Sequence, residues 1–223
     1  MHPFVQIVEK EFHKHHNLER SIPMAAYLKN HFELLGIKNP ERKEIQKKVF
    51  AEQGIPAIDE IEIVVKELWD LPFREFHYLA MDLLDRYKNK VPETTIELYH
   101  YMIVNQSWWD SIDAIASKLV GALVKRYPEL IDSHIDSWSL DENMWLQRTA
   151  ILHQLKYKEQ ANTELLTKYI ERSMGTNEFF LNKAIGWSLR QHSRVDPQWV
   201  INFVNEHPGL ANLSKKEALR LII

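Results

Sequence analysis

Trp109 and Asp113 are the residues of this chain whose types and spacing most directly suggest chemistry. They stand four positions apart in the segment SWWDSID (107–113), so in a helix their side chains lie on the same face and touch. The pair falls at the margin of an apolar arc that contains Ile112, Ile115, Leu119 and Leu123. A carboxylate at such a margin is either an inert ion-pair partner or an acid held against a substrate. Position alone favours the ion-pair partner.

Arg148 is a second candidate, because it falls near the middle of an apolar arc. The other members of that arc are Met144, Trp145, Ile151, Leu152 and Leu155. An unpaired buried guanidinium is costly, so Arg148 must either meet an anion or reach solvent. The anion is either a carboxylate on an adjacent helix or a phosphate of a ligand, and the residues alone favour a salt bridge between neighbouring helices.

Trp187 is the third candidate, because it lies opposite the apolar stripe of its helix. The stripe is formed by Leu181, Ile185 and Leu189. The face around Trp187 carries three cations, Lys183, Arg190 and Arg194. An aromatic ring among cations suits a surface that meets phosphates and bases. The alternative is a tryptophan covered by the next helices, and the residues leave both interpretations open.

Helices are the elements that must position these side chains. Apolar residues recur every three or four positions along the whole chain, and strand patterns are nearly absent. We expect helices near residues 3–15, 23–35, 40–53, 57–68, 72–88, 93–104, 108–125, 128–138, 142–157, 163–174, 178–193, 197–206 and 215–223.

The spacing of large aromatic residues predicts a repeat. Trp69, Trp109, Trp145 and Phe180 each open a long helix, at intervals of 40, 36 and 35 residues, and a shorter helix fits in each interval. This pattern predicts an all-α, HEAT-like solenoid, in which helix pairs stack around one concave surface. Equivalent faces of stacked repeats line the same groove, so the three candidates are expected to converge. An irregular all-helical globule is the alternative.

Local signals predict several helix ends. Asp196-Pro197 is a capping residue followed by proline in the first turn. Residues Ser107 to Asp110 and Ser214 to Glu217 have the spacing of capping boxes. Gly36 and Gly175 fall where a left-handed residue would end a helix.

Charge and composition bound the function only loosely. The net charge is −3, but residues 140–223 carry 11 Lys and Arg against 9 Asp and Glu. A local basic groove can therefore exist on an acidic body, because salt screens exposed charges beyond roughly 8–10 Å. The chain has no cysteine, which excludes disulfides and cysteine-based metal sites and fits a reducing cytoplasm.

Other classes of site and segment are not expected. No signal peptide is visible, and no apolar run approaches the roughly 20 residues that span a bilayer. His13, His15 and His16 lie close together near the N-terminus. Because no suitably spaced carboxylate or cysteine accompanies them, a solvated helix face is expected rather than a metal site.

Several segments closely resemble the AlkD-type bacterial DNA alkylation repair glycosylases. They are MHPFV (1–5), PMAAYLKNHFELLGI (23–37), ELWDLPFREFHYLAMDLL (67–84), SWWDSIDAI (107–115), NMWLQRTAILHQLKYK (143–158), FFLNKAIGWSLR (179–190) and LSKKEAL (213–219). The resemblance covers nearly the whole chain. It implies a single HEAT-like domain over residues 1–223, which binds duplex DNA in a concave basic groove. It further implies excision of cationic alkylpurines, chiefly of the 3-methyladenine and 7-methylguanine types.

The resemblance also implies roles for individual residues. Trp109 and Trp187 match the two groove tryptophans that pack around the deoxyribose of the lesion, Asp113 the catalytic carboxylate, and Arg148 the arginine of the same cleft. Contacts to DNA are expected from Tyr27, Lys38, Lys156, Lys183, Arg190 and Arg194. Lys38 departs from the family pattern, in which an amide residue precedes a threonine-proline step, so its contact is left open.

The function that the resemblance implies is hydrolysis of an N-glycosidic bond without a cofactor. We also expect a cytoplasmic protein that binds no metal and acts as a monomer. A cationic alkylpurine leaves as a neutral base, while a carboxylate stabilises the positive charge that develops on the sugar. Two alternatives stay open. One is a relative that binds altered duplex DNA without cleaving it, and the other is a protein-interaction scaffold.

Overall fold

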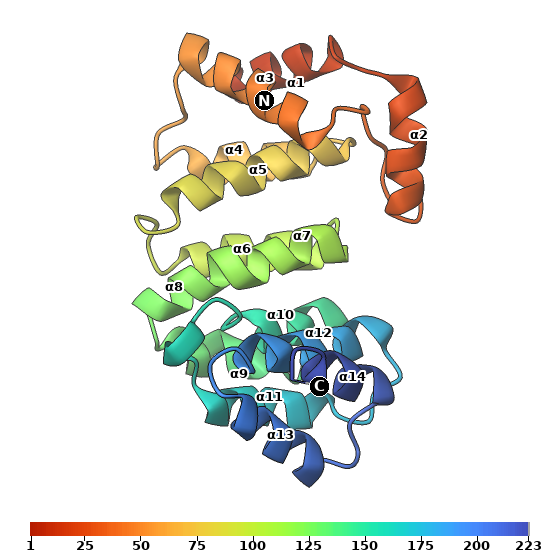
Figure 1. Ribbon diagram of the computed structural model, residues 1–223. Helices are drawn as coiled ribbons and strands as arrows, with labels where there is room; N and C mark the ends of the chain where they lie inside the picture. The colour runs from red at the N-terminus through yellow and green to blue at the C-terminus, as the bar shows by residue number, and fades with distance from the viewer. Residues whose placement is uncertain (223) are drawn as a thin grey trace. The chain divides into compact units, whose positions relative to one another are not determined.

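The computed structural model describes residues 1–222, and within that range the regular elements are helical (Figure 1). The chain forms two compact units, residues 1–91 and residues 92–223. The N-terminal unit contains α1 (Pro3–His13), α2 (Leu18–Tyr27), α3 (Asn39–Gln53), α4 (Ile61–Trp69) and α5 (Arg74–Tyr87). The all-α class is thereby confirmed, whereas one functional domain over the whole chain and a concave DNA-binding groove stay predictions.

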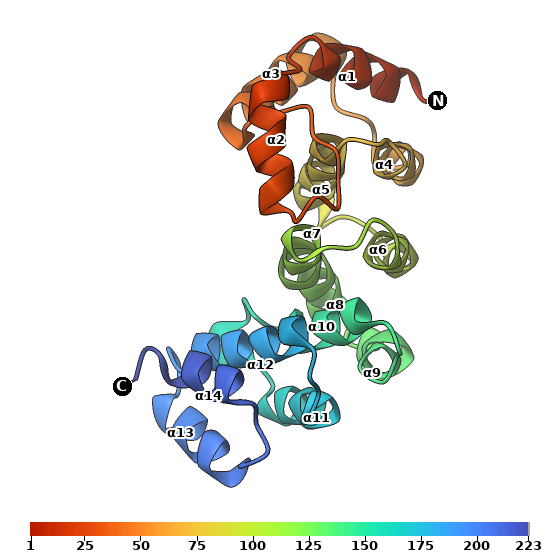
Figure 2. The ribbon, with the colours of Figure 1, turned by 90° about the vertical axis from the view of Figure 1, so that its right-hand side faces the viewer.

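The C-terminal unit begins with α6 (Thr95–Val104) and a long helix made of α7 (Trp109–Ala114), the π-helical turn η1 (Ile115–Val120) and α8 (Gly121–Arg126). It continues with η2 (Ile131–Ile135), α9 (Asp136–Trp138), α10 (Met144–Leu152), η3 (Lys158–Gln160), α11 (Thr163–Ser173), α12 (Phe179–His192), α13 (Pro197–Glu206) and α14 (Asn212–Leu219). The long helix, α10, α12 and α14 pack on one another in that order (Figure 2).

Polar contacts between successive helix pairs confirm the predicted helical repeat in this unit. The Tyr157 hydroxyl donates to the carbonyl of Gly121, 36 positions earlier, and the Tyr169 hydroxyl donates to Asp136, 33 positions earlier. These separations are close to the predicted intervals of 36 and 35 residues. In both cases a tyrosine therefore bonds to an earlier helix pair, once through a backbone carbonyl and once through a carboxylate, as stacked units allow.

The long helix of residues 109–126 differs from the predicted α-helix by its π-helical turn. Such turns are uncommon and often occur at functional sites. The Ser117 hydroxyl, inside η1, donates to the backbone carbonyl of Asp113 at 2.7 Å. Gly121 follows η1 directly, and a Cβ there would collide with the carbonyl oxygen of His153. The residue after the π-helical turn therefore lies in close contact with the backbone at the end of α10.

The predicted helix over residues 23–35 is wrong in both bounds, and only residues 23–27 of it are helical. The observed helix α2 begins at Leu18, because the side chain of Asn17 caps it by accepting a hydrogen bond from the amide of Arg20. It ends at Tyr27, and the following segment is not helical. The amides of residues 35–37 instead bond to the buried carboxylate of Glu75, about one repeat away.

Gly36 explains why this turn can form. It adopts the predicted left-handed conformation, with φ +80°, but it does not end a helix. A Cβ at Gly36 would collide with the backbone carbonyl of Asn17. Only glycine therefore allows the segment to approach the start of α2 and to present its amides to Glu75.

Other predictions of helix ends had mixed outcomes. Asp196 caps α13 and Gly175 follows α11 with φ +85°, as predicted. Trp69 does not open a helix but ends α4, fully buried. Neither capping box forms. Ser107 donates to the carbonyl of Ile103, and α14 begins two residues before Ser214.

The core of the C-terminal unit follows the predicted apolar stripes. Leu181, Ile185 and Leu189 are buried, while Trp187 is only half-buried on the other side of α12. Within residues 1–222, none of the helices combines the length and the apolar character needed to cross a membrane.

Candidate active site in the C-terminal unit

Arg148 and Asp113 form an ion pair between neighbouring repeats. The Arg148 Nε and Nη2 atoms each lie 2.8 Å from Oδ1 of Asp113. The Arg148 side chain is 4% exposed, against 21% for Asp113. Arg148 also donates to the backbone carbonyl of Phe180, on the third helix of the stack. The buried guanidinium therefore has the carboxylate partner that its position predicted, and it connects all three helices.

The carboxyl group of Asp113 lies in an environment that opposes its ionisation. Burial raises the pKa of Asp113 above its ordinary value, and the charge of nearby Asp110 acts in the same direction. The charge and hydrogen bonds of Arg148 lower the pKa and offset part of this effect. Both contacts from Arg148 go to Oδ1, and within residues 1–222 no hydrogen bond occupies Oδ2. A partly desolvated carboxylate oxygen is thus available for another group.

A pocket of about 280 Å³ lies beside this ion pair. We call it the indole pocket; it is lined by Trp109, Arg148, Phe179, Phe180, Lys183, Trp187, Arg190 and Glu217. The structure therefore brings Trp109, Trp187 and Arg148 to one cavity, as the sequence predicted. Asp113 is not among the lining residues, but it contacts Arg148, which lines the pocket.

An aromatic cluster supports the base of the indole pocket. The ring of Phe180 lies 5.2 Å from that of Trp108 and 5.1 Å from that of Trp145, measured between centroids. The rings of Trp108 and Trp145 are 5.8 Å apart. Trp145 and Phe180 belong to α10 and α12, and Trp108 directly precedes α7. Two of the pairs are edge-to-face and the Trp145–Phe180 pair is tilted. Such contacts hold large rings in fixed orientations, so they restrict movement of the helices that carry the site.

The predicted cations of α12 have different surroundings. Lys183 and Arg190 line the indole pocket, and both form ion pairs with Glu217 of α14. Arg194 is exposed, follows the end of α12 and does not line the pocket. Lys156 is also exposed, in the turn after α10 rather than inside a helix. Neither of these two cations is brought to the pocket.

Two further predicted contacts belong to the N-terminal unit. Tyr27 and Lys38 are exposed and line a hollow of about 570 Å³ there. The remaining lining residues are Glu19, Arg20, Pro23, Met24, Leu28, Leu34 and Tyr78. His13, His15 and His16 are also exposed in this unit.

The prediction from sequence missed Phe179, Phe180 and Glu217 as residues of the pocket. Phe180 carried a signal, because its position marks the start of a repeat, but nothing in the local pattern shows that it faces a cavity. The spacing of Ser214 and Glu217 predicted a capping box instead. Glu217 is the more informative omission, because its carboxylate lies among the cations that were expected to bind phosphate.

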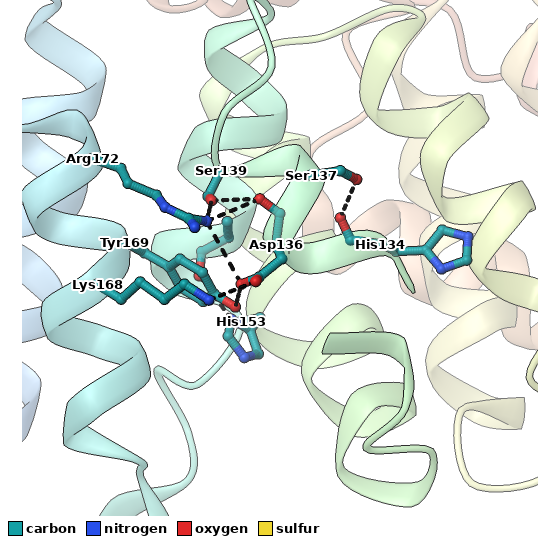
Figure 3. Close-up of polar contacts among 9 residues, drawn as sticks. His134, Asp136, Ser137, Ser139, His153, Lys168, Tyr169 and Arg172 are labelled. Atoms are coloured by element: carbon teal, nitrogen blue, oxygen red, sulfur yellow. Dashed lines mark hydrogen bonds and ion pairs between the residues drawn. The ribbon is translucent and has the colours of Figure 1, made fainter. Parts of the chain in front are cut away.

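A second carboxylate cluster, which sequence analysis also missed, surrounds Asp136 (Figure 3). Its oxygens accept hydrogen bonds from Lys168 at 2.5 Å and from Tyr169 at 2.8 Å. Arg172 donates to the backbone carbonyl of Asp136 and to Ser139. Burial acts to raise the pKa of Asp136, but the hydrogen bonds and neighbouring cations outweigh it and hold the pKa below its ordinary value. These contacts join α9 to α11, and none of these residues lines the indole pocket.

Comparisons with known proteins agree with the all-α fold and show the family of this chain. A family model described as DNA alkylation repair enzyme matches residues 8–222. A solved structure, described as a predicted DNA alkylation repair enzyme from Enterococcus faecalis, is 32% identical in sequence. The similarity covers 92% of this chain and 96% of that one, with a TM-score of 0.84. A search of curated proteins finds no match.

Proposed function

Because this chain belongs to the DNA alkylation repair enzyme family, we propose that it is a DNA glycosylase acting on purines alkylated at N3 or N7 in duplex DNA. The observation that carries the proposal is the indole pocket, where Trp109 and Trp187 face one cavity beside the Arg148–Asp113 ion pair. Two aromatic faces and a partly buried carboxylate are suited to a substrate that becomes positively charged at its sugar.

The reaction needs little more than stabilisation of charge. An N3- or N7-alkylated purine is cationic, so it leaves as a neutral base and no general acid has to protonate it. The bond between C1′ of the sugar and the base nitrogen breaks, and the electron pair leaves with the base. The sugar then has oxocarbenium character until water attacks C1′. Asp113 is suited to stabilise that charge through Oδ2 and to accept the proton of the water.

The other residues of the pocket would position the nucleotide. The faces of the two indoles attract a nearby cation by roughly 0.5–2 kcal/mol each. Lys183 and Arg190 are suited to contact the flanking phosphates. Arg148 lowers the pKa of Asp113 and so offsets part of the effect of burial, and its contact with Phe180 fixes the ion pair relative to α12.

Release of the modified base from duplex DNA that contains 7-methylguanine tests the proposal. We expect Asp113→Asn to slow release by about 10²–10³, the loss that removal of one strongly stabilising group typically causes. Asp132→Asn is the matched control, because Asp132 is an exposed carboxylate of the same unit, and it should retain the wild-type rate.

The outcomes separate the three candidate functions. Release that depends on Asp113 supports the glycosylase. Salt-sensitive DNA binding without release by the wild type would instead favour a non-cleaving DNA-binding protein. If neither binding nor release occurs, the helical repeat serves another partner, as protein-interaction scaffolds do.

A further inference from the structure

Glu217 lies in an unexpected position, because it places a negative charge inside the cationic part of the indole pocket. Its Oε1 atom is 2.8 Å from Nζ of Lys183, and its Oε2 atom accepts a hydrogen bond from Arg190. Lys183 and Arg190 stand two turns apart on α12, with Trp187 between them on the same side. One carboxylate therefore bridges the two cations that flank the indole.

The packing of α14 on α12 holds Glu217 in this place. The fully buried Ser214 donates to the carbonyl of Asn182 at 2.8 Å, so the start of α14 is anchored to α12. Gly186 permits the close approach: a Cβ there would lie 2.6 Å from Cβ of Glu217 and 3.0 Å from the carbonyl oxygen of Ser214. The two helices lie side by side in both views (Figures 1 and 2).

The electrostatics of Glu217 are those of an ion that stays charged. The hydrogen bond from Lys183 lowers the pKa of Glu217 below its ordinary value, and the charges of Lys183, Arg190 and Arg220 act in the same direction against burial. The Glu217 side chain is 14% exposed. At neutral pH the two cations are therefore already paired with an internal anion before any ligand arrives.

A DNA phosphate would need the same donors. Phosphate and carboxylate oxygens both accept charge-assisted hydrogen bonds from lysine and arginine. A phosphate that approaches Lys183 and Arg190 must compete with Glu217, so part of the binding free energy is spent in separating the ion pairs. This cost weakens binding of undamaged DNA most, because undamaged DNA places no cationic nucleotide against the two indoles and so gains no binding free energy there.

We propose that Glu217 is a positioning residue that occupies the place of a DNA phosphate between Lys183 and Arg190 and thereby lowers the affinity for undamaged duplex. This inference rests on the proposed function of the same pocket. It assigns Glu217 a part in discrimination between damaged and undamaged DNA, and it leaves the bond-breaking step to Asp113.

The affinity of Glu217→Gln for unmodified duplex DNA, measured over a range of salt concentrations, tests the inference. The two cations then become available for one more phosphate contact. We expect affinity to rise roughly tenfold at about 50 mM salt, and the slope of log affinity against log salt to steepen by about 1. Glu206→Gln is the matched control: Glu206 is exposed at the end of α13, and loss of its charge should change affinity less than about twofold.

Gly186→Ala gives an independent test that keeps every charge. The added Cβ displaces α14 and separates Glu217 from the cations, so affinity for unmodified duplex should rise in the same direction. Thermal unfolding checks that each variant is folded. An unchanged salt slope or weaker binding by folded Glu217→Gln would overturn the inference and give Glu217 a purely structural role.

Base release distinguishes this failure from failure of the proposed glycosylase. If the wild type binds DNA and Glu217→Gln binds it more tightly, but no alkylated base is released, only the glycosylase proposal fails. If the wild type releases base and Glu217→Gln binds undamaged DNA as the wild type does, only the inference on Glu217 fails.

Discussion

Asp113 and Asp136 of the C-terminal unit both bond to side chains of a later helix, but their surroundings shift their pKa values in opposite directions. Each accepts hydrogen bonds from side chains of the next repeat, 35 positions away for Asp113 and 32 and 33 positions away for Asp136. Asp136 has several donors and a pKa below its ordinary value, whereas burial raises the pKa of Asp113, which is paired with a single arginine.

The difference shows how one repeat contact can serve structure or chemistry. The oxygens of Asp136 are used by Lys168 and Tyr169, so this carboxylate joins two repeats and has little capacity for a ligand (Figure 3). At Asp113 one oxygen takes both contacts from Arg148, and the arginine itself lines the indole pocket. A buried carboxylate with an unpaired oxygen lowers the stability of the fold. The same unpaired oxygen allows the carboxylate to act on a substrate.

Replacement of Arg148 by methionine should show the largest difference in effect between the Asp113 pair and the Asp136 cluster. It leaves Asp113 buried without its counter-ion, so we expect a loss of about 3 kcal/mol in the free energy of unfolding. The pKa of Asp113 should rise further, and base release at neutral pH should fall by roughly 10²-fold. The acid limb of the pH–rate profile should move to higher pH, because activity requires the carboxylate and is lost as pH falls through its pKa.

Arg172→Met is the matched control for that prediction. It removes an arginine that bonds to the backbone carbonyl of Asp136, so it should lower stability without moving the pH–rate profile. Equal effects of both arginine variants on base release would show that the distinction between the two clusters is wrong.

His153 should make the region under the Asp136 cluster sensitive to acid. Its ring lies 6.0 Å from that of Tyr169, and its Nδ1 bonds to the carbonyl of Ala150. Burial lowers the pKa of His153 from 6.5 to about 4, and Nε2 has no hydrogen-bond partner in the described part of the chain. The unfolded state therefore binds a proton more readily, and stability present above pH 6.5 should be lost as pH falls towards about 4.

The expected loss is roughly 3 kcal/mol over that range, from about 1.4 kcal/mol for each pKa unit. Chemical unfolding of the wild type and of His153→Leu at several pH values measures it. The variant should be less stable at pH 7 but show a flatter dependence on pH. The exposed His16 provides the control, and the same flattening in His16→Leu would contradict the assignment to His153.

Asp136→Asn should have the smallest effect. It weakens charge-assisted contacts at a partly exposed group, so we expect a loss of about 1 kcal/mol in the free energy of unfolding. Base release should stay at the wild-type rate once the protein is folded. A large loss of base release by a folded Asp136→Asn variant would mean that the cluster reaches the site through the packing of the repeats.

Much of the architecture was predictable because it depends on local periodicity. Apolar residues three and four positions apart decided which face of α12 is buried, so Trp187 was correctly placed opposite Leu181, Ile185 and Leu189. Regular spacing of Trp109, Trp145 and Phe180 predicted the repeat, and Asp196 predicted the start of α13. These features need only the geometry of one helix and its neighbour in sequence.

Predictions failed where distant atoms competed with local signals. The amides of residues 35–37 bind Glu75 instead of continuing a helix. Ser214 bonds to α12, and Glu217 pairs with Lys183 and Arg190, so the expected capping box does not form. A motif of four residues cannot indicate a partner about thirty positions away, because that partner is set by the packing of another helix.

The sequence by itself determined that the chain is a helical repeat, which faces are buried, and which side chains carry suitable chemistry. Only the tertiary structure decided that Arg148 takes Asp113 as its partner and that Glu217 enters the pocket between two cations. The physical reason is that burial of a charge is costly until an opposite charge compensates it. The compensating group comes from whichever repeat packs closest, and local periodicity contains no information on that choice.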